Sequence, residues 1–250
     1  MKHAAMICLA VVAVLAMTTT GAMAQNSDNF DSYTAGLVIP PGNGWVGWGG
    51  PSANCIVTAG PANSSPNSLA AVGGAGTDQV FEFGYGPKTG LWDFSTMTYV
   101  PSDGQAGETY FNLMNKFDDA GGVYEWSVVG VHWMMDATNE RFGKVYNDNT
   151  PAGEGLDIIY DAWVEVGADI DLDNNLCEIF YGGASLGAPV PWSGAAVLGI
   201  EVMDIYPISG DASVIYYDNV SLTQVPEPSS LLMLLGVGFG AVVVYRRRRR

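Results

Sequence analysis

The stretch from Trp163 to Tyr181, WVEVGADIDLDNNLCEIFY, decides the fold class. In its first half every second residue is apolar and most residues between are acidic, the two-residue period of a strand with one buried and one wet face. The predicted buried residues are Val164, Val166, Ala168, Ile170 and Leu172, and the predicted wet residues are Glu165, Asp169, Asp171 and Asp173. Asn174-Asn175 then breaks the pattern before a second apolar run, so we predict an antiparallel hairpin.

The residues around this hairpin also favour strands. Gly is frequent, and no long stretch has apolar residues at three- and four-residue spacing, so helical patterns are scarce. Further predicted strands, rich in β-branched and aromatic residues, are Asp78 to Tyr85, Glu108 to Asn115, Val123 to Trp133 and Val214 to Thr223. We therefore predict one all-β domain from Gln25 to Gln224, an antiparallel β-sandwich of jelly-roll type.

The N-terminus has the pattern of a cleavable signal peptide. Lys2 and His3 form a short basic start, and an apolar run follows. Ala22 and Ala24 give a small-x-small cleavage site, which assigns Met1 to Ala24 to the signal and predicts export.

The predicted domain is strongly acidic. Between Gln25 and Gln224 there are 25 acidic and 4 basic residues, a formal charge of 4 minus 25, or −21. Nucleic acid is not an expected partner, because phosphates are bound by positive side chains that replace their counterions. Solubility outside the cell is the simpler explanation of this charge, and binding of divalent cations is the alternative.

The C-terminus, from Val225 to Arg250, holds three features in order. Pro226, Glu227 and Pro228 come first, and the uncharged stretch Leu231 to Tyr245 follows. Five arginines end the chain: Arg246, Arg247, Arg248, Arg249 and Arg250. The uncharged stretch predicts a short transmembrane helix. Arginines are hard to translocate, so they would stay cytoplasmic and leave the domain outside.

This order resembles the PEP-CTERM sorting signal of exported bacterial proteins. The resemblance implies that the Pro-Glu-Pro residues mark a recognition site for exosortase, a membrane protease-transpeptidase, and that the segment after them is removed. The precursor would be anchored in the membrane, and the product would reach the cell surface or the extracellular polysaccharide matrix.

The predicted domain also resembles concanavalin A-like and laminin G-like sandwiches. The resemblance lies in the opening NFDSY at 29–33, the hairpin at 164–187 and the closing YYDNVSLT at 216–223. Such sandwiches include lectins, glycan-binding modules, hydrolases and spacers, so the fold does not decide the function.

Two cysteines remain after removal of the signal peptide, Cys55 and Cys177. In an oxidising compartment they could form a disulfide. Two buried thiols are the alternative, and the sequence favours neither.

A serine-nucleophile motif and a zinc site are the candidate catalytic centres, and the sequence supports neither. Gly183 to Gly187 spells G-x-S-x-G, but the motif needs a following helix and a later histidine, whereas prolines follow and His132 comes earlier. We expect His132 to be a packed strand residue. One histidine and two distant cysteines supply too few ligands for a usual zinc site.

Calcium is the metal to consider. Asp169, Asp171 and Asp173 are spaced like the start of a calcium loop, but position twelve is Phe180 instead of glutamate. If the first and last strands meet, Asp31 and Asp218 could share a structural calcium ion. No other cofactor is expected.

Tryptophans are the best indication of a ligand, because sugar rings stack on indole faces. Trp45 and Trp48 lie in the glycine-rich segment PPGNGWVGWGG and are candidates for glycan binding, although hydrophobic lids over the sandwich are an alternative explanation. We therefore expect a non-enzymatic exported protein. A carbohydrate-binding module and a jelly-roll glycoside hydrolase with paired carboxylates remain alternatives.

Overall fold

The computed structural model describes residues 26–50, 55–73, 77–84, 86–103, 105–151, 153–194, 199–207 and 214–226. The predicted signal peptide, the predicted transmembrane helix, Glu227, Pro228 and the arginines lie outside these residues. Pro226 is the last residue described, and it is exposed. In the described ranges no helix is both long and apolar enough to cross a membrane.

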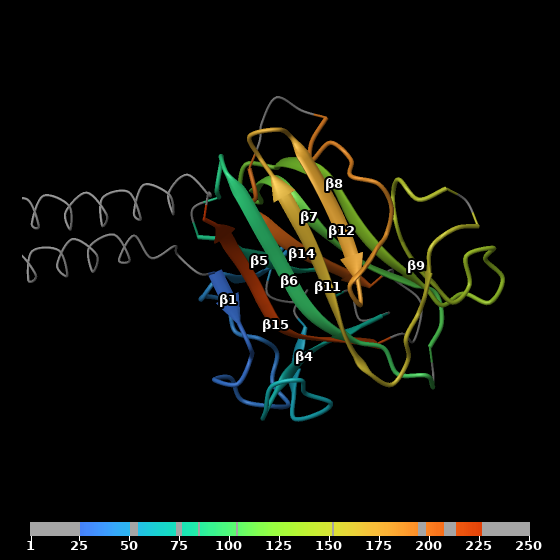
Figure 1. Cartoon of the computed structure of the whole chain (residues 1–250). Coiled ribbons are helices and arrows are strands. Elements are labelled where there is room, and N and C mark those ends of the chain that lie inside the picture. Colours follow the sequence, from blue (N-terminus) through green and yellow to red (C-terminus); the bar gives the residue numbers. More distant parts are fainter. Residues whose placement is uncertain are drawn as a thin grey trace, which may run out of the picture.

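The described residues form two antiparallel sheets, which confirms the predicted sandwich (Figure 1). An eight-stranded sheet has the order β13-β12-β11-β6-β15-β4-β3, with β1 paired to β15. Its strands are β1 (Asn26–Asp28), β3 (Ile56–Thr58), β4 (Ser68–Val72), β6 (Leu91–Tyr99), β11 (Trp163–Asp171), β12 (Leu176–Tyr181), β13 (Ala184–Ser185) and β15 (Val214–Val225).

The second sheet has seven strands in the order β10-β9-β8-β7-β14-β5-β2. Its strands are β2 (Trp45–Gly47), β5 (Gln79–Glu82), β7 (Glu108–Asp118), β8 (Val123–Met134), β9 (Lys144–Asn147), β10 (Leu156–Asp157) and β14 (Val202–Pro207). Figure 1 shows this sheet behind the strands β12, β11, β6 and β15.

The predicted hairpin is confirmed as β11 and β12. All five residues predicted to be buried are at most 6% exposed, and the acidic residues between them point away from the core. Asn175 holds a left-handed φ of 54° in the turn, and the carboxylate of Asp171 accepts hydrogen bonds from the backbone and side-chain nitrogens of Asn174 at 2.9 and 2.7 Å. The turn asparagines therefore fix the register of the hairpin.

One core fills the space between the sheets. It joins Phe94, Val166 and Leu222 of the eight-stranded sheet to Phe111 and Trp133 of the seven-stranded sheet. Because successive residues of a strand point to opposite faces, the neighbours of these core residues form the outer faces of the sandwich.

The last strand lies in the middle of its sheet. β15 is flanked by β6 and β4, and β1 also pairs with it, so that Asn26 is opposite Leu222. The first and last strands therefore meet, and both ends of the described chain lie at one end of the sandwich (Figure 1).

The two cysteines are free and buried. Cys55 directly precedes β3 at one edge of the eight-stranded sheet, whereas Cys177 lies in β12 near the other edge. Five strand spacings separate β3 from β12, about 24 Å. A disulfide needs Cα atoms within roughly 7 Å, so the strand order excludes the disulfide alternative.

Candidate functional site

Four aromatic rings cross the outer face of the seven-stranded sheet, and we call them the aromatic row. They are Tyr146 of β9, His132 of β8, Tyr110 of β7 and Tyr206 of β14. Each ring is directly opposite the next in the strand register. Ring centroids are 4.9 Å apart between Tyr146 and His132, 5.1 Å between His132 and Tyr110, and 5.3 Å between Tyr110 and Tyr206. The pairing of the strands therefore builds one continuous row.

The rings of the aromatic row stand on edge. His132 stacks on Tyr146 with only 10° between the two planes, and the other pairs are tilted. The side chain of His132 is 15% exposed, while Tyr110 and Tyr206 are half-buried. The row therefore offers solvent ring edges and polar atoms more than ring faces.

Two carboxylates hold His132. Its Nδ1 is 2.7 Å from Oε1 of Glu108, and its Nε2 is 2.9 Å from Oδ1 of Asp148. Burial lowers the pKa of His132, but the hydrogen bonds to Asp148 and Glu108 outweigh it and raise the pKa to about 9. His132 is a packed strand residue, as expected, and the raised pKa favours its charged form at neutral pH.

Glu108 connects the cation to the next strand. Its Oε1 also accepts a hydrogen bond from the hydroxyl of Tyr146. Burial raises the pKa of Glu108, but hydrogen bonds from His132 and Tyr146 outweigh burial and lower the pKa. The guanidinium of Arg141 lies 4.1 Å from the centre of the Tyr146 ring. This end of the aromatic row is thus a fixed network of paired charges.

A second, polar row runs beside the aromatic one. Asn112 is opposite both Gly130 and Asp204 in the strand register. A Cβ atom on Gly130 would lie 2.6 Å from Oδ2 of Asp148 and 2.7 Å from Oδ1 of Asn112. Glycine at this position leaves room for these two side chains, which would have to move aside for a larger residue.

The polar row continues into a pair of buried carboxyl groups, Asp204 and Asp78. Asp204 is 2% exposed, and the Oδ1 atoms of both residues are buried without a hydrogen-bond partner. Burial raises the pKa of Asp204 well above its usual range, and the neighbouring Asp78 raises it further. Burial likewise raises the pKa of Asp78, which is hydrogen-bonded to Asp204. Proximity and burial therefore favour a proton on this pair of carboxyl groups.

A second group of rings lies toward the β7–β8 turn of the same sheet. Trp48 packs on Tyr124 with centroids 4.6 Å apart and on the edge of Phe117 at 5.1 Å. These three rings are partly buried against Val80, Met114 and Val202, which also lie outside the main core. Trp48 therefore remains a candidate for glycan binding.

Trp45 is not a candidate, and the prediction for it is wrong. It is fully buried, packs 4.7 Å from Phe81 and donates a hydrogen bond from Nε1 to Oδ2 of Asp28 at 2.8 Å. A buried indole cannot stack on a sugar. The glycine-rich segment contains the strand β2, which pairs with β5 and places Trp45 in the seven-stranded sheet.

Asp31 and Asp218 both have hydrogen-bond partners within the protein. Asp218 is fully buried, and its carboxylate accepts hydrogen bonds from the backbone nitrogens of Asn63 and Ser64, both at 2.8 Å. Asp31 accepts a hydrogen bond from the backbone of Asn67 at 3.1 Å. In the described residues no group of three or more histidine, cysteine or acidic side chains could hold a metal ion. Both aspartates instead fix the loop between β3 and β4.

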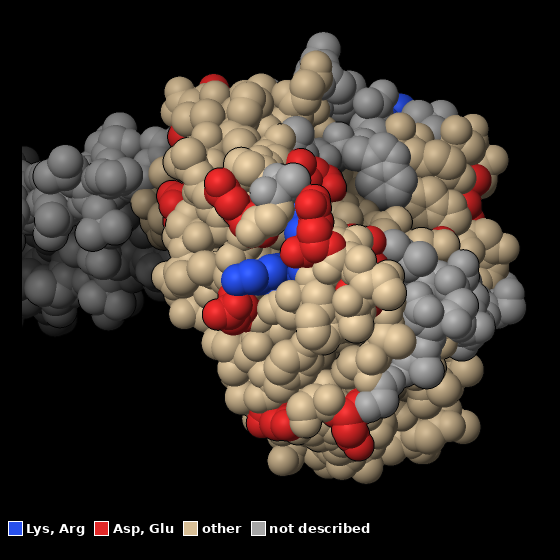
Figure 2. Space-filling view, turned by 90° about the vertical axis from the view of Figure 1, so that its right-hand side faces the viewer, with Lys and Arg blue, Asp and Glu red and all other residues tan. Residues whose placement is uncertain are grey.

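The end of the sandwich opposite the termini carries many acidic and few basic side chains (Figure 2). Two of the lysines are paired with carboxylates, Lys144 with Asp157 at 2.7 Å and Lys88 with Glu201 at 2.6 Å. The field around the described surface is therefore negative.

Comparison with known families decides the character of the C-terminus. Residues 224–250 match the family described as "PEP-CTERM protein-sorting motif". The chain carries a PEP-CTERM sorting motif. This finding confirms the resemblance and implies an exported precursor that passes through the membrane and is processed by an exosortase. A search of curated protein sequences gives no match.

The PEP-CTERM motif directly adjoins the folded domain. Its first residue, Gln224, is still in β15, where it is opposite Trp92. Val225 ends the strand opposite Leu91, and the exposed Pro226 follows. The described chain therefore passes from a paired strand into the sorting motif without a linker.

Solved structures similar to this chain confirm the fold. A sialidase superposes with a TM-score of 0.52 and 9% identity over 79% of this chain and 18% of its own. A carbohydrate esterase from the Shiga toxin-encoding bacteriophage phi24B superposes with a TM-score of 0.50 and 11% identity over 80% of this chain and 100% of its own. This chain thus spans less than a fifth of the sialidase, and at such identities the likeness concerns the fold alone.

Sequence reasoning did not find the aromatic row or the Asp78–Asp204 pair. Their members come from strands that are distant along the chain, and no local spacing connects them. A usable signal was present within single strands, because Tyr110 and Asn112 alternate with the buried Phe111 and Leu113. Ser185 of the G-x-S-x-G pattern lies in β13 and donates its hydroxyl to the carbonyl of Gly187, without a catalytic partner.

Proposed function

We propose that this PEP-CTERM protein is a non-enzymatic, exported carbohydrate-binding protein. An exosortase-like enzyme processes its tail, and the product works at the cell surface or in the extracellular polysaccharide. The observation that carries the ligand class is the aromatic row beside the polar row on one face. The antiparallel β-sandwich contributes only a rigid platform for that face.

Sugar hydroxyl groups fit the chemistry of this face. Each hydroxyl both donates and accepts hydrogen bonds, and the two rows place phenol, amide and carboxylate groups side by side. The half-buried edges of Tyr110 and Tyr206 add apolar contact for the carbon-bound hydrogens of a sugar. A row across four strands favours a chain of sugar units over a single small molecule.

The charge of the protein selects among polysaccharides. On this face His132 is enclosed by two carboxylates and Lys144 is paired with Asp157, and the domain as a whole is acidic. A polyanion would meet like charge over much of the surface. We therefore propose neutral polysaccharides as the ligands.

The carboxyl pair supports binding over hydrolysis. Glycoside hydrolases hold two carboxyl groups roughly 5 to 9.5 Å apart, with the sugar or a water between them. Asp78 and Asp204 are hydrogen-bonded to each other, which leaves no room for either. We propose that this pair braces the face and that bound glycans leave it intact.

Substitution on the face tests the ligand class. Tyr110→Ala and Tyr206→Ala should each weaken retention on gels containing a bound neutral polysaccharide by about tenfold, since each removes a hydrogen bond and a ring. The matched control is Tyr216→Ala, because Tyr216 is a half-buried tyrosine in the ring cluster with Tyr99 on the other outer face. The bound glycan should show no new reducing ends.

Two results would contradict this proposal. Equal retention of all variants would remove the aromatic row as the binding surface, and loss only in Tyr216→Ala would move the site to the other sheet. Release of reducing sugar by the wild type, abolished in Asp204→Asn, would replace binding by hydrolysis.

Processing of the tail has its own test, the intact mass of the protein from its native host. We expect the wild type to lack Arg250, and we expect Glu227→Ala to accumulate as a longer species that retains it. Glu201→Ala is the control, since Glu201 directly precedes β14 of the seven-stranded sheet, away from the tail. A wild-type protein that keeps the complete tail would disprove processing.

A further inference from the structure

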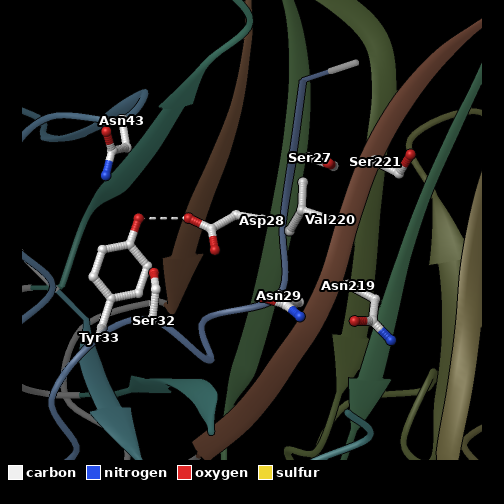
Figure 3. A pocket seen from close by; sticks show the side chains of 9 residues that line it. All are labelled: Ser27, Asp28, Asn29, Ser32, Tyr33, Asn43, Asn219, Val220 and Ser221. Carbon is white, nitrogen blue, oxygen red and sulfur yellow. Dashed lines mark hydrogen bonds between the residues drawn. The ribbon is translucent and has the colours of Figure 1, made fainter. Parts of the chain in front are cut away.

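A polar cavity lies where the first and last strands of the domain meet, away from the aromatic row. Its volume is about 590 Å³ (Figure 3). Seven of its nine lining residues are Asn, Ser or Asp, and the full set is Ser27, Asp28, Asn29, Ser32, Tyr33, Asn43, Asn219, Val220 and Ser221. None of the nine is basic, and Val220 is the only aliphatic member.

The backbone around this cavity is unusually constrained. Five described residues other than glycine have a φ in the left-handed region, and two of them line the cavity: Asn43 and Asn219, both at 51°. In β15 the register with β6 also shifts between Asp218 and Ser221. Left-handed residues and bulges cost free energy and concentrate at functional sites. Their coincidence here indicates a built site.

The cavity offers neutral groups. Oδ1 of Asp28 accepts the backbone N–H of Phe30 at 2.8 Å, and its Oδ2 accepts the hydroxyl of Tyr33 at 2.6 Å and Nε1 of Trp45 at 2.8 Å. Figure 3 shows the bond to Tyr33. With the carboxylate occupied by these donors, the cavity is lined mainly by amides and hydroxyls. Such a lining suits neither an anion nor a metal ion.

We propose that this cavity binds one neutral sugar or polyol unit. Amides and hydroxyls match the donors and acceptors of a polyol, and the volume lies in the range of small-molecule sites. This site is separate from the aromatic row and does not depend on it. A protein with both sites would bind a sugar chain along the seven-stranded sheet and a single sugar unit beside β1 and β15 of the eight-stranded sheet.

Glycine substitution tests the cavity without straining the fold. Asn43→Gly and Asn219→Gly remove the amide side chains, and glycine accepts the left-handed φ of each position. Asn175→Gly is the matched control, because Asn175 has a φ of 54° in the β11–β12 turn outside the cavity. The full chain is purified in a detergent without a sugar head group and titrated calorimetrically with glucose, galactose, mannose and N-acetylglucosamine. Glucuronate serves as the charged comparison.

We expect at least one neutral sugar to bind the wild type and Asn175→Gly equally, and Asn43→Gly and Asn219→Gly about tenfold more weakly, the equivalent of one lost hydrogen bond. Glucuronate should bind more weakly than glucose. Tyr110→Ala should bind like the wild type, which separates this site from the aromatic row. Failure of all four sugars to bind the wild type, or equal binding by all variants, would overturn the proposal.

Discussion

His132 sets the charge of the proposed binding face. Without its proton, the imidazole could donate only one hydrogen bond, while Glu108 and Asp148 both require a donor from it. The cation therefore keeps two acidic groups on neighbouring elements together. Its position between Tyr146 and Tyr110 also makes it the link that joins the rings of the aromatic row.

The stability of the fold should depend on this proton. The pKa of His132 is raised to about 9 from an ordinary value of 6.5. Its contribution is therefore complete below pH 6.5 and is lost as the pH rises through 9. Thermal unfolding should show a decline in Tm of the wild type across this window, and His132→Gln should flatten it.

An NMR titration of the imidazole provides the independent measurement. His132 should titrate near pH 9, whereas an imidazole without such partners titrates near 6.5. A midpoint near 6.5 for His132 would contradict the clamp of two carboxylates.

For single residues, the sequence indicated which side chains could bind a ligand but not which of them are exposed. Trp45 and Trp48 stand three positions apart in one glycine-rich segment, and composition treats them alike. The structure separates them, because Trp45 enters a strand beside β5 and is buried, while Trp48 follows that strand and is only partly buried. Which tryptophan is buried depends on pairing with a distant strand, which neither residue encodes locally.

Single elements were predictable where local and global patterns agree. The alternation in β11 and the asparagines after it predicted the hairpin correctly, since one face of each strand is buried and the turn is short. β4 was not predicted, because Ser68–Val72 reads SLAAV, without aromatic residues or a polar face. β4 lies between β3 and β15, and residues on both of its faces are buried. The alternation that marks a half-exposed strand is therefore absent.

β1 is a short element, and its stability rests on one side chain. The carboxylate of Asp28 satisfies Nε1 of the fully buried Trp45 as well as the hydroxyl of Tyr33. Asp28→Ala should lower the free energy of unfolding by roughly 1 to 3 kcal/mol, since it leaves a buried donor unpaired. Asp28→Asn, which keeps an acceptor oxygen, should lose less in denaturant unfolding. Equal losses in the two variants would show that these hydrogen bonds are not what stabilises β1.

For the whole molecule, negative charge is the dominant long-range interaction. It is concentrated in part by the strand register, which places Asp169 directly opposite both Asp93 and Glu178 on the outer face of the eight-stranded sheet. Burial raises the pKa of Asp93, and the charges of Asp169 and Glu165 raise it further. Like charges directly opposite one another destabilise a sheet.

Salt and substitution should relieve this repulsion in the same way. Asp169→Asn should raise Tm, and the gain should shrink when the salt concentration rises from about 0.01 M to 1 M, because the screening length falls from about 30 Å to 3 Å. Asp157→Asn, which instead removes the partner of Lys144, should give no such gain. If Asp169→Asn gains as much at high salt as at low salt, the benefit is not electrostatic.

Because β15 lies in the middle of its sheet, folding and sorting both require the C-terminal part of the chain. The sheet cannot close until Val214 to Val225 have been delivered, and the PEP-CTERM motif that directs sorting starts within the same residues. A chain truncated anywhere before β15 would therefore lack both the central strand of this sheet and the sorting motif. Fragments that end before β15 would therefore not compete with full-length molecules for the sorting machinery, because they lack the sorting motif.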